Sequence, residues 1–275
     1  MRIAVTGAQG YLGSQLCQRL RAEGHEVFEL VRRPSGSLHQ IEFSLGGPID
    51  PAVFSSRGIE SLVHVAYDFR QTHWESIRRI NYEGSVALFN AFKEGGGQYG
   101  VYVSTIAAWE GCRSLYGRVK LLTEKAATDH GFWILRPGLI RGGAPGGIVG
   151  TMLRFLRTLP AVPVIGYGLK CLYGIRVGPL CEAVSWMSVR QPKNPIDALV
   201  IAADGVPMSL DDVLRETIAE QGLGRRILIP CPWQLVWAGI RTLETLGISI
   251  GLRSDSVISL MNQDPNPRFR DLKAL

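Results

Sequence analysis

The chain has 275 residues, of which 46% are hydrophobic and 20% are charged, as expected for a globular protein with one sizeable core or one core and a small appended lobe. Its formal net charge is +6, but the 30 lysines and arginines are scattered, without a basic run or an aromatic-interleaved stripe. A pocket for an anionic cofactor and an anionic substrate explains this excess as well as a nucleic acid would, and we expect no nucleic-acid partner.

Cysteine spacing and apolar runs indicate the class of protein. The five cysteines show no paired spacing, so we expect reduced thiols, no disulfide framework and no metal site. Met1 leads directly into a strand pattern, from which we predict no signal peptide and a cytoplasmic location. The most apolar late stretch, residues 233–250, is interrupted by Arg241 and Glu244, which predicts an amphipathic helix rather than a membrane span.

The chain begins with the pattern of a strand, a glycine-rich turn and a helix. Residues 3–6 are rich in β-branched side chains, three glycines follow, and leucines then recur at helical spacing. The first glycine allows the turn, the second lets backbone N–H groups approach a pyrophosphate, and the third lets the helix pack on the strand. The diphosphate then lies at the positive end of the helix dipole. We therefore predict a dinucleotide site contacted by Gly7, Gly10, Tyr11, Leu12 and Gly13.

The segment Thr6-Gly7-x-x-Gly10-x-x-Gly13 resembles the extended or atypical short-chain dehydrogenase/reductases, the NAD-dependent epimerase/dehydratase family. This family includes nucleotide-sugar epimerases, dehydratases and ketoreductases. The likeness runs through most of the chain and weakens toward its end. It implies a Rossmann-type fold, a nicotinamide dinucleotide cofactor and a homodimer formed through helices that flank the sheet.

The second strand, residues 25–31, bears on the choice between NAD and NADP. NAD-binding Rossmann folds carry an acidic residue near the end of this strand, which bonds the ribose 2′-hydroxyl. Here the position is Val31, and Arg32 and Arg33 follow it. Two guanidinium groups suit a 2′-phosphate, so we predict NADP, with NAD as the alternative. The other interpretation is that both arginines belong to a solvated strand end.

Strands at residues 39–43 and 60–66 follow, and the second of these ends in Val63-His64-Val65-Ala66. This ending resembles the family's segment beside the cofactor, which implies that Ala66 contacts it. We interpret His64 as a hydrogen-bonded core residue rather than a catalyst. A polar loop at residues 68–72 is expected over the pocket. Asn81, in the next helix, either relays protons as the resemblance implies or bonds neighbouring backbone.

The fifth strand, residues 99–104, ends in hydroxyl side chains. Its terminus, Ser104-Thr105-Ile106-Ala107-Ala108, is similar to the family's strand end that carries the catalytic hydroxyl. Aligning Trp109 with the family's usual tyrosine places Thr105 in the catalytic position. A shift of one residue would place Ser104 there instead, and both remain open.

The strongest catalytic signal is Tyr116-Gly-Arg-Val-Lys120. A tyrosine and a lysine four residues apart project from the same face of a helix. A lysine ammonium beside a phenol favours the phenolate and lowers its pKa from about 10, as a general acid near neutrality requires. The resemblance implies that Lys120 also holds the nicotinamide ribose.

The sixth strand, residues 132–138, resembles the family's Leu-Arg-Pro segment and places Pro137 near the nicotinamide. Alternation of strand and helix up to this point predicts an α/β fold with a doubly wound parallel sheet. We expect residues 1–141 to form the dinucleotide-binding domain, with a last strand at residues 196–202. Residues 142–275 would mostly form a small substrate-binding lobe.

The second part departs from the family's pattern. It predicts a helix at residues 151–159, an extended segment at 162–173, and helices at 210–220 and from Trp233 onward. Where the family has Arg-Asp-Phe-Val-His-Val-Asp-Asp, this chain reads Leu-Tyr-Gly-Ile-Arg-Val-Gly-Pro at residues 172–179. Replacements for the missing nucleotide clamp are Arg141, Arg154, Arg157 and Arg176, unless these are solvated cations.

These features together favour an NADP-dependent oxidoreductase that reduces a sugar-like carbonyl, most simply a nucleotide-linked 4-keto sugar. Tyr116 would protonate the carbonyl oxygen, Thr105 would hydrogen-bond it, and Lys120 would tune the phenol. One alternative is a nucleotide-sugar 4-epimerase that retains NAD. Another is a non-catalytic NADPH-binding sensor or accessory subunit, against which the retained Tyr116 and Lys120 argue.

Overall fold

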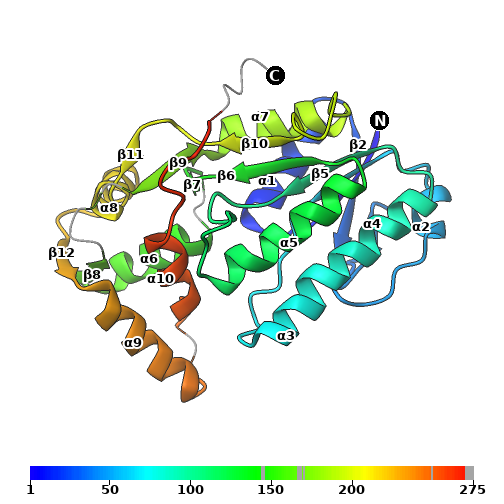
Figure 1. The fold of residues 1–275 in the computed structure, drawn as a ribbon. Helices are drawn as coiled ribbons and strands as arrows, with labels where there is room; N and C mark the ends of the chain where they lie inside the picture. The colour runs from blue at the N-terminus through cyan, green and yellow to red at the C-terminus, as the bar shows by residue number, and fades with distance from the viewer. Residues whose placement is uncertain (144–145, 166–168, 170, 249, 270–275) are drawn as a thin grey trace.

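A seven-stranded parallel sheet forms the centre of the computed structural model, which describes residues 1–143, 146–165, 169, 171–248 and 250–269 (Figure 1). All its pairings are parallel, with β1 in the interior. The expected doubly wound α/β fold is confirmed. In order across the sheet, the strands are β10 (Leu199–Ala202), β6 (Trp133–Pro137), β5 (Tyr99–Val103), β4 (Ser61–His64), β1 (Arg2–Thr6), β2 (Glu26–Val31) and β3 (Gln40–Glu42).

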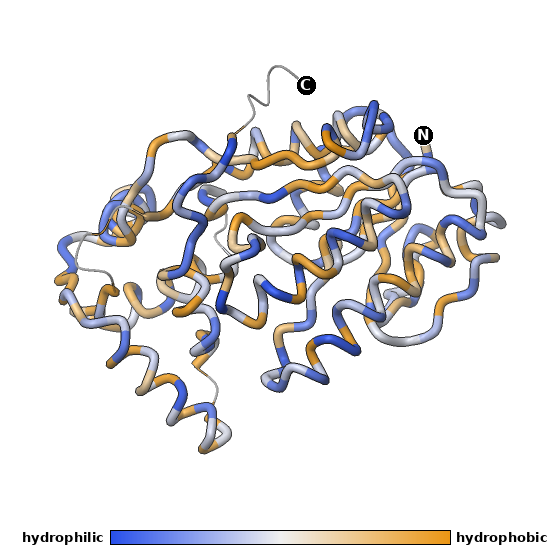
Figure 2. The backbone as a smooth tube through the Cα atoms, in the orientation of Figure 1, coloured by the Kyte–Doolittle hydropathy of each residue, from blue (hydrophilic) through white to orange (hydrophobic). Residues whose placement is uncertain are grey.

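Helices cover both faces of this sheet, because the strands are apolar on both sides. Figure 2 shows hydrophobic residues along the central strands and alternating with hydrophilic ones along the flanking helices. One core cluster lies under α1 (Tyr11–Ala22) and α7 (Val177–Ser188). The other is rich in phenylalanine and lies under α2 (Ala52–Ser55), α4 (Gly84–Glu94) and α5 (Leu115–Asp129). Thus α7 and β10, both beyond residue 141, belong to the sheet body.

A short helical stretch follows the loop at residues 67–72, which lines the cavity described below, and precedes α4. It consists of α3 (Trp74–Ile77) and the π-helical segment η1 (Arg78–Glu83), and it continues directly into α4. π-Helical turns are rare and commonly occur at functional sites. Asn81 lies within this segment and is buried.

The second lobe has its own hydrophobic core and two small sheets. The expected extended segment at 162–173 is split between these sheets, since β8 pairs with β12 whereas β9 pairs with β7 and β11. Residues 166–168 and 170 of that segment lie outside the described residues. The elements are β7 (Leu139–Arg141), α6 (Gly147–Thr158), β8 (Ala161–Ile165), β9 (Leu172–Arg176), β11 (Pro207–Met208), α8 (Leu210–Glu220), β12 (Ile227–Cys231), α9 (Trp233–Thr245) and α10 (Ser254–Met261).

None of the helices among the described residues is both long and apolar enough to cross a membrane. The apolar stretch from Trp233 forms the 13-residue helix α9, in which Ile240 is the buried residue. No group of three or more histidine, cysteine or acidic side chains in the described part of the chain could hold a metal ion.

A buried chain of polar groups joins the ends of β1 and β4. The Thr6 hydroxyl donates to Nδ1 of His64 at 2.7 Å and accepts the backbone N–H groups of Val65 and Ala66. Ser85 donates to the Asn81 carbonyl, so Nε2–H of His64 must donate to the Ser85 oxygen at 2.9 Å. Burial, together with the nearby Lys120 charge, lowers the pKa of His64 to about 3. His64 is therefore a neutral core residue, as expected.

This buried imidazole should make stability depend on pH. A histidine that stays neutral when folded but binds a proton when unfolded loses stabilising effect as pH falls from about 6.5 toward 3. His64→Asn should therefore be less stable than the wild type at pH 7. The difference in free energy of unfolding between the two proteins should be about 2 kcal/mol smaller at pH 5. Urea unfolding at both pH values measures this. His73→Asn, at an exposed position, is the control. A stability difference between the wild type and His64→Asn that is the same at both pH values would contradict the conclusion that His64 is neutral in the folded protein.

Candidate functional site

The glycine turn brings α1 directly against the end of β1. Gly7 has a φ of +67°, and a Cβ atom at Gly13 would lie only 2.1 Å from the Gly7 carbonyl oxygen. The N–H of Gly10 donates to that same oxygen at 2.9 Å. Helix α1 has neither a side-chain cap nor an acidic residue in its first turn, so its N-terminal N–H groups are open to an anion. The turn therefore fits the diphosphate of a dinucleotide.

A cavity of about 1800 Å³ lies at the carboxyl ends of the central strands, between the sheet and the second lobe. This is where open α/β sheets bind ligands. Of the residues expected from the sequence, Arg33 does not line the cavity. Those that do are Gly7, Gly10, Tyr11, Leu12, Gly13, Arg32, Ala66, Thr105, Tyr116, Lys120 and Pro137.

Tyr116 lies at the first turn of α5, enclosed by aromatic rings. Tyr67 contacts it edge-on with ring centroids 4.9 Å apart, and Phe69 stacks on it at 5.7 Å. Burial raises the pKa of Tyr116 to about 12, and a hydrogen bond from the Thr105 side chain opposes this rise. The structure thus brings Thr105 and Tyr116 together at the cavity wall.

Lys120 lies one helical turn after Tyr116 and is buried. Its ammonium donates to the Val103 carbonyl at 2.8 Å and lies 4.7 Å from the centre of the Tyr102 ring. Burial lowers the pKa of Lys120 to about 7, although the carboxylate of Glu124 raises it. The sequence interpretation had the lysine lower the pKa of Tyr116. In the structure burial dominates, and it shifts the pKa of each group in the direction that favours its neutral form.

The neighbouring Ser104 hydroxyl has a different partner. It donates to Oε1 of Glu124, and Arg136 holds both oxygens of that carboxylate at 2.8 and 2.5 Å. Ser104 and Glu124 are both buried. Adjacent residues at a strand end point to opposite sides. Ser104 therefore satisfies a buried ion pair, whereas Thr105 reaches Tyr116.

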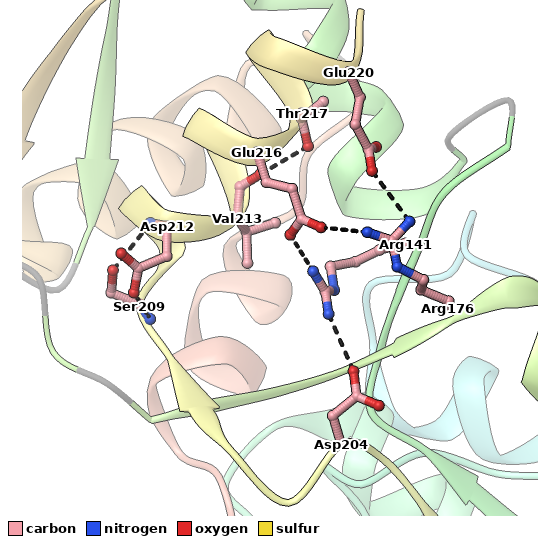
Figure 3. A network of polar contacts seen from close by, with 9 residues as sticks. All are labelled: Arg141, Arg176, Asp204, Ser209, Asp212, Val213, Glu216, Thr217 and Glu220. Atoms are coloured by element: carbon pink, nitrogen blue, oxygen red, sulfur yellow. Dashed lines mark hydrogen bonds and ion pairs between the residues drawn. The ribbon is translucent and has the colours of Figure 1, made fainter.

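The candidate arginines fall into two groups. Arg141 and Arg176 share the carboxylate of Glu216, and Asp204 and Glu220 complete the network (Figure 3). These two guanidinium groups are neutralised at the junction of β7, β9 and α8, and they do not line the cavity.

The remaining arginines face the cavity. Arg154 bonds the Thr151 hydroxyl at 3.0 Å and Arg157 the Gln221 side chain at 2.9 Å, and neither has a carboxylate partner among the described residues. Arg253, which the sequence interpretation missed, also lines the cavity, and its buried Nε has no hydrogen-bond partner in the described part of the chain. These cations can meet an anionic ligand.

Asn81 fixes the loop over the cavity. Its amide oxygen accepts the N–H of Asp68 at 2.7 Å, and its nitrogen donates to the Asp68 carbonyl at 3.2 Å. This contact supports the interpretation of Asn81 as a backbone anchor, and it positions the neighbouring Tyr67 and Phe69. The sequence also gave no signal for Asp255, whose carboxylate reaches the start of α5 from the far lobe.

Comparison with known proteins agrees with the fold described above. Residues 3–130 match the model of the NAD dependent epimerase/dehydratase family. The chain is 30% identical over 171 residues to a ceramide reductase of Caulobacter vibrioides, which is 59% of this chain and 53% of that relative. It is 30% identical over 134 residues to the photosystem II assembly factor Ycf39 of Synechocystis sp., which is 47% of this chain and 40% of that relative. The matches thus span about half the length or less of these curated relatives.

Solved structures extend the similarity into the second lobe. MoeE5 in complex with UDP-glucose and NAD has a TM-score of 0.72 and 21% identity, over 84% of this chain and 85% of that chain. The parallel sheet and glycine turn define a Rossmann-like α/β fold that these solved structures share. The match of residues 3–130 to the model of the NAD dependent epimerase/dehydratase family, together with the fold shared with solved structures, confirms the resemblance for this part of the chain.

The separate partners of Ser104 and Thr105 predict separate consequences of their removal. Ser104→Ala deprives a buried carboxylate of a donor and should lower the free energy of unfolding by about 1.5–3 kcal/mol. Thr105→Ala should cost less, because Thr105 is only half-buried. Urea denaturation of both variants measures the difference. Equal losses would show that Ser104 does not support Glu124 as described.

Proposed function

We propose that the protein is an NADPH-dependent carbonyl reductase that uses Tyr116, Thr105 and Lys120. The observation that carries this proposal is the contact between the Thr105 and Tyr116 side chains, with Lys120 one turn along α5, on the wall that also carries Pro137 and the glycine turn. A nicotinamide cofactor supplies the hydride when it is bound. Its diphosphate would lie on the glycine turn. A Cβ atom at Gly13 would overlap the Gly7 carbonyl and prevent α1 from approaching β1 at this turn.

The chain's own residues would handle the proton. Tyr116 donates its phenolic proton to the carbonyl oxygen, and Thr105 hydrogen-bonds the charge that develops there. With a pKa of about 12, Tyr116 is fully protonated at neutral pH and therefore ready to act as the acid. Its conjugate phenolate is then stabilised by the ammonium of Lys120.

We propose NADP rather than NAD as the preferred cofactor. Val31 is buried at the end of β2, and the next residue, Arg32, is exposed and lines the cavity. The neighbouring wall is formed by Phe43, Ser44 and Leu45, which offer no carboxylate to a ribose 2′-hydroxyl. A guanidinium at this position suits the doubly charged 2′-phosphate.

The two adjacent arginines give a matched pair of variants. Arg32→Ala should weaken NADPH binding by about 10-fold or more and leave NADH binding nearly unchanged, because a charge-assisted bond contributes about 1.5–3 kcal/mol. Arg33→Ala should change neither, since Arg33 does not line the cavity. Fluorescence titration with both cofactors measures this. Tighter NADH than NADPH binding in the wild type, or NAD retained on purification, would instead favour the epimerase alternative.

The substrate we propose is a nucleotide-linked 4-keto sugar, whose diphosphate would meet Arg154, Arg157 and Arg253. The support is their position on the cavity wall without carboxylate partners among the described residues. The homodimer and the cytoplasmic location remain part of the proposal and rest on the sequence and family resemblance.

A second candidate substrate is a long-chain lipid carbonyl. The similarity to a ceramide reductase favours it, as do the apolar side chains of Ile148, Leu153 and Leu252 on the same wall. Leu246 and Ile248 near the cavity edge are exposed, at 67% and 50%. A hydrocarbon chain would cover this apolar surface.

Substrate screening tests the proposed chemistry. Oxidation of NADPH is followed by absorbance with a dTDP-linked 4-keto hexose and, separately, with a long-chain 3-keto lipid in detergent. Tyr116→Phe should lower kcat by about 100-fold or more while leaving NADPH affinity unchanged. Turnover of the lipid alone would put the second candidate first. Turnover of neither, with NADPH still bound, would favour the non-catalytic sensor.

The rate should also fall as pH rises above about 7. The ammonium of Lys120 is present below its pKa of about 7 and lost above it, whereas Tyr116 stays protonated up to about 12. We therefore expect a plateau in kcat at low pH and a decline above neutrality. Lys120→Arg keeps the charge and should shift the decline upward. A kcat that increases above pH 7 in the wild type would contradict these roles.

A further inference from the structure

The carboxylate of Asp255 binds the backbone of the tyrosine at the proposed centre. Oδ1 accepts the N–H of Leu115 at 2.8 Å, and Oδ2 accepts the N–H of Tyr116 itself at 3.0 Å. Asp255 is only 9% exposed and lies in α10 of the second lobe. Tyr116 lies in α5, so the contact joins the second lobe to the sheet body.

These bonds satisfy the start of α5. The first N–H groups of a helix have no partner within it, and the end of a helix frays unless they are capped. Ser114 is the N-cap and accepts the N–H of Gly117 at 3.0 Å, which leaves those of Leu115 and Tyr116 to Asp255. A carboxylate also lies favourably at the positive end of the helix dipole.

We infer that Asp255 is a positioning residue that fixes the Tyr116 phenol in place for proton transfer. This inference rests on the proposed function. Because Tyr116 lies in the first turn, its backbone is held by the cap and not by helix bonds on both sides. The phenol must stay within reach of Thr105 and the carbonyl, and a displacement near 1 Å can cost about 100-fold in rate.

Further contacts show that α10 is itself held firmly. Glu244, at the end of α9, accepts the backbone and hydroxyl of Ser254 at 3.0 and 2.6 Å. After α10, Asn262 accepts the N–H of Arg113 at 2.7 Å and, through its carbonyl, the indole N–H of Trp109 at 3.2 Å. The loop before α5 and the start of α5 are thus both fixed to α10.

The position of Arg253 connects this cap with the substrate. It lies two residues before Asp255, lines the cavity, and has a buried Nε without a partner among the described residues. An anionic substrate bound by Arg253 would therefore engage the segment that holds Tyr116. Substrate binding in the second lobe and the placement of the acid would be linked through Arg253 and Asp255.

Three variants separate positioning from general stabilisation. Asp255→Ala removes both acceptors, and the isosteric Asp255→Asn keeps one. Asp212→Ala is the matched control, because Asp212 accepts the Ser209 N–H in the capping box of α8, away from the cavity. The measurements are thermal unfolding, hydrogen exchange of the Leu115 and Tyr116 amides, NADPH affinity, and kcat and KM for the carbonyl substrate that the wild type reduces.

We expect Asp255→Ala to raise exchange of the two amides at least about 10-fold and to lower kcat about 10- to 100-fold, with NADPH affinity unchanged. Asp255→Asn should recover part of kcat. Asp212→Ala, at an exposed capping residue, should lower thermal stability to a smaller extent and leave kcat and these amides unchanged. Wild-type kcat in Asp255→Ala would overturn the inference, as would an equal loss of kcat in Asp212→Ala.

The proposed function and the positioning role can fail separately. If Tyr116→Phe retains the wild-type rate, Tyr116 is not the acid, and the role of Asp255 in catalysis fails with it. If the wild type reduces no carbonyl, exchange of the Leu115 and Tyr116 amides decides whether Asp255 positions this backbone. Unchanged exchange in both Asp255 variants would then overturn the inference. If Asp255→Ala does not fold, Asp255→Asn provides the same comparison.

Discussion

The close approach of α1 to the end of β1 is the constraint on which the rest of the site depends. A Cβ atom at Gly13 would overlap the Gly7 carbonyl, and one at Gly7 would lie 3.0 Å from the Ala66 nitrogen. Only glycine fits such contacts, so the turn fixes α1 beside β1 and β4. The Thr6–His64 chain beneath it satisfies the polar groups that this close packing buries. The uncapped helix start is thereby left open to the cavity.

The same burial that stabilises the fold determines the chemistry of the site. It holds His64 neutral, raises the pKa of Tyr116 and lowers the pKa of Lys120. For a proton donor a raised pKa is acceptable, because the group needs its proton at the start of the reaction. In the proposed reaction, the phenolate that remains after Tyr116 has given up its proton must be stabilised, and a charged Lys120 can stabilise it. Environment, and not the simple proximity of lysine to tyrosine, therefore sets the balance of protonation states.

The sequence alone was enough to predict those features of the fold and site that local residue patterns determine. The glycine turn, the order of strands and helices, and the Tyr116–Lys120 spacing all follow from short periodicities, and the parallel sheet follows from their alternation. The sequence could not decide whether Ser104 or Thr105 faces Tyr116, because a shift of one residue exchanges the two sides of a strand. It missed the split of β8 from β9 and the role of Asp255, since both depend on contacts with distant segments.

The geometry of the proposed catalytic site is consequently shared between the sheet body and the second lobe. Thr105 and Lys120 are positioned by β5 and α5 of the sheet body, whereas the backbone of Tyr116 is held by a carboxylate 139 residues away in sequence. The lobe whose Arg253 lines the cavity thus also caps the helix that carries Tyr116, the proposed acid. If Arg253 binds the substrate as proposed, a change in this lobe that alters which substrate binds would also alter the position of Tyr116. In the proposed mechanism, specificity and rate would therefore be coupled through one short helix, α10.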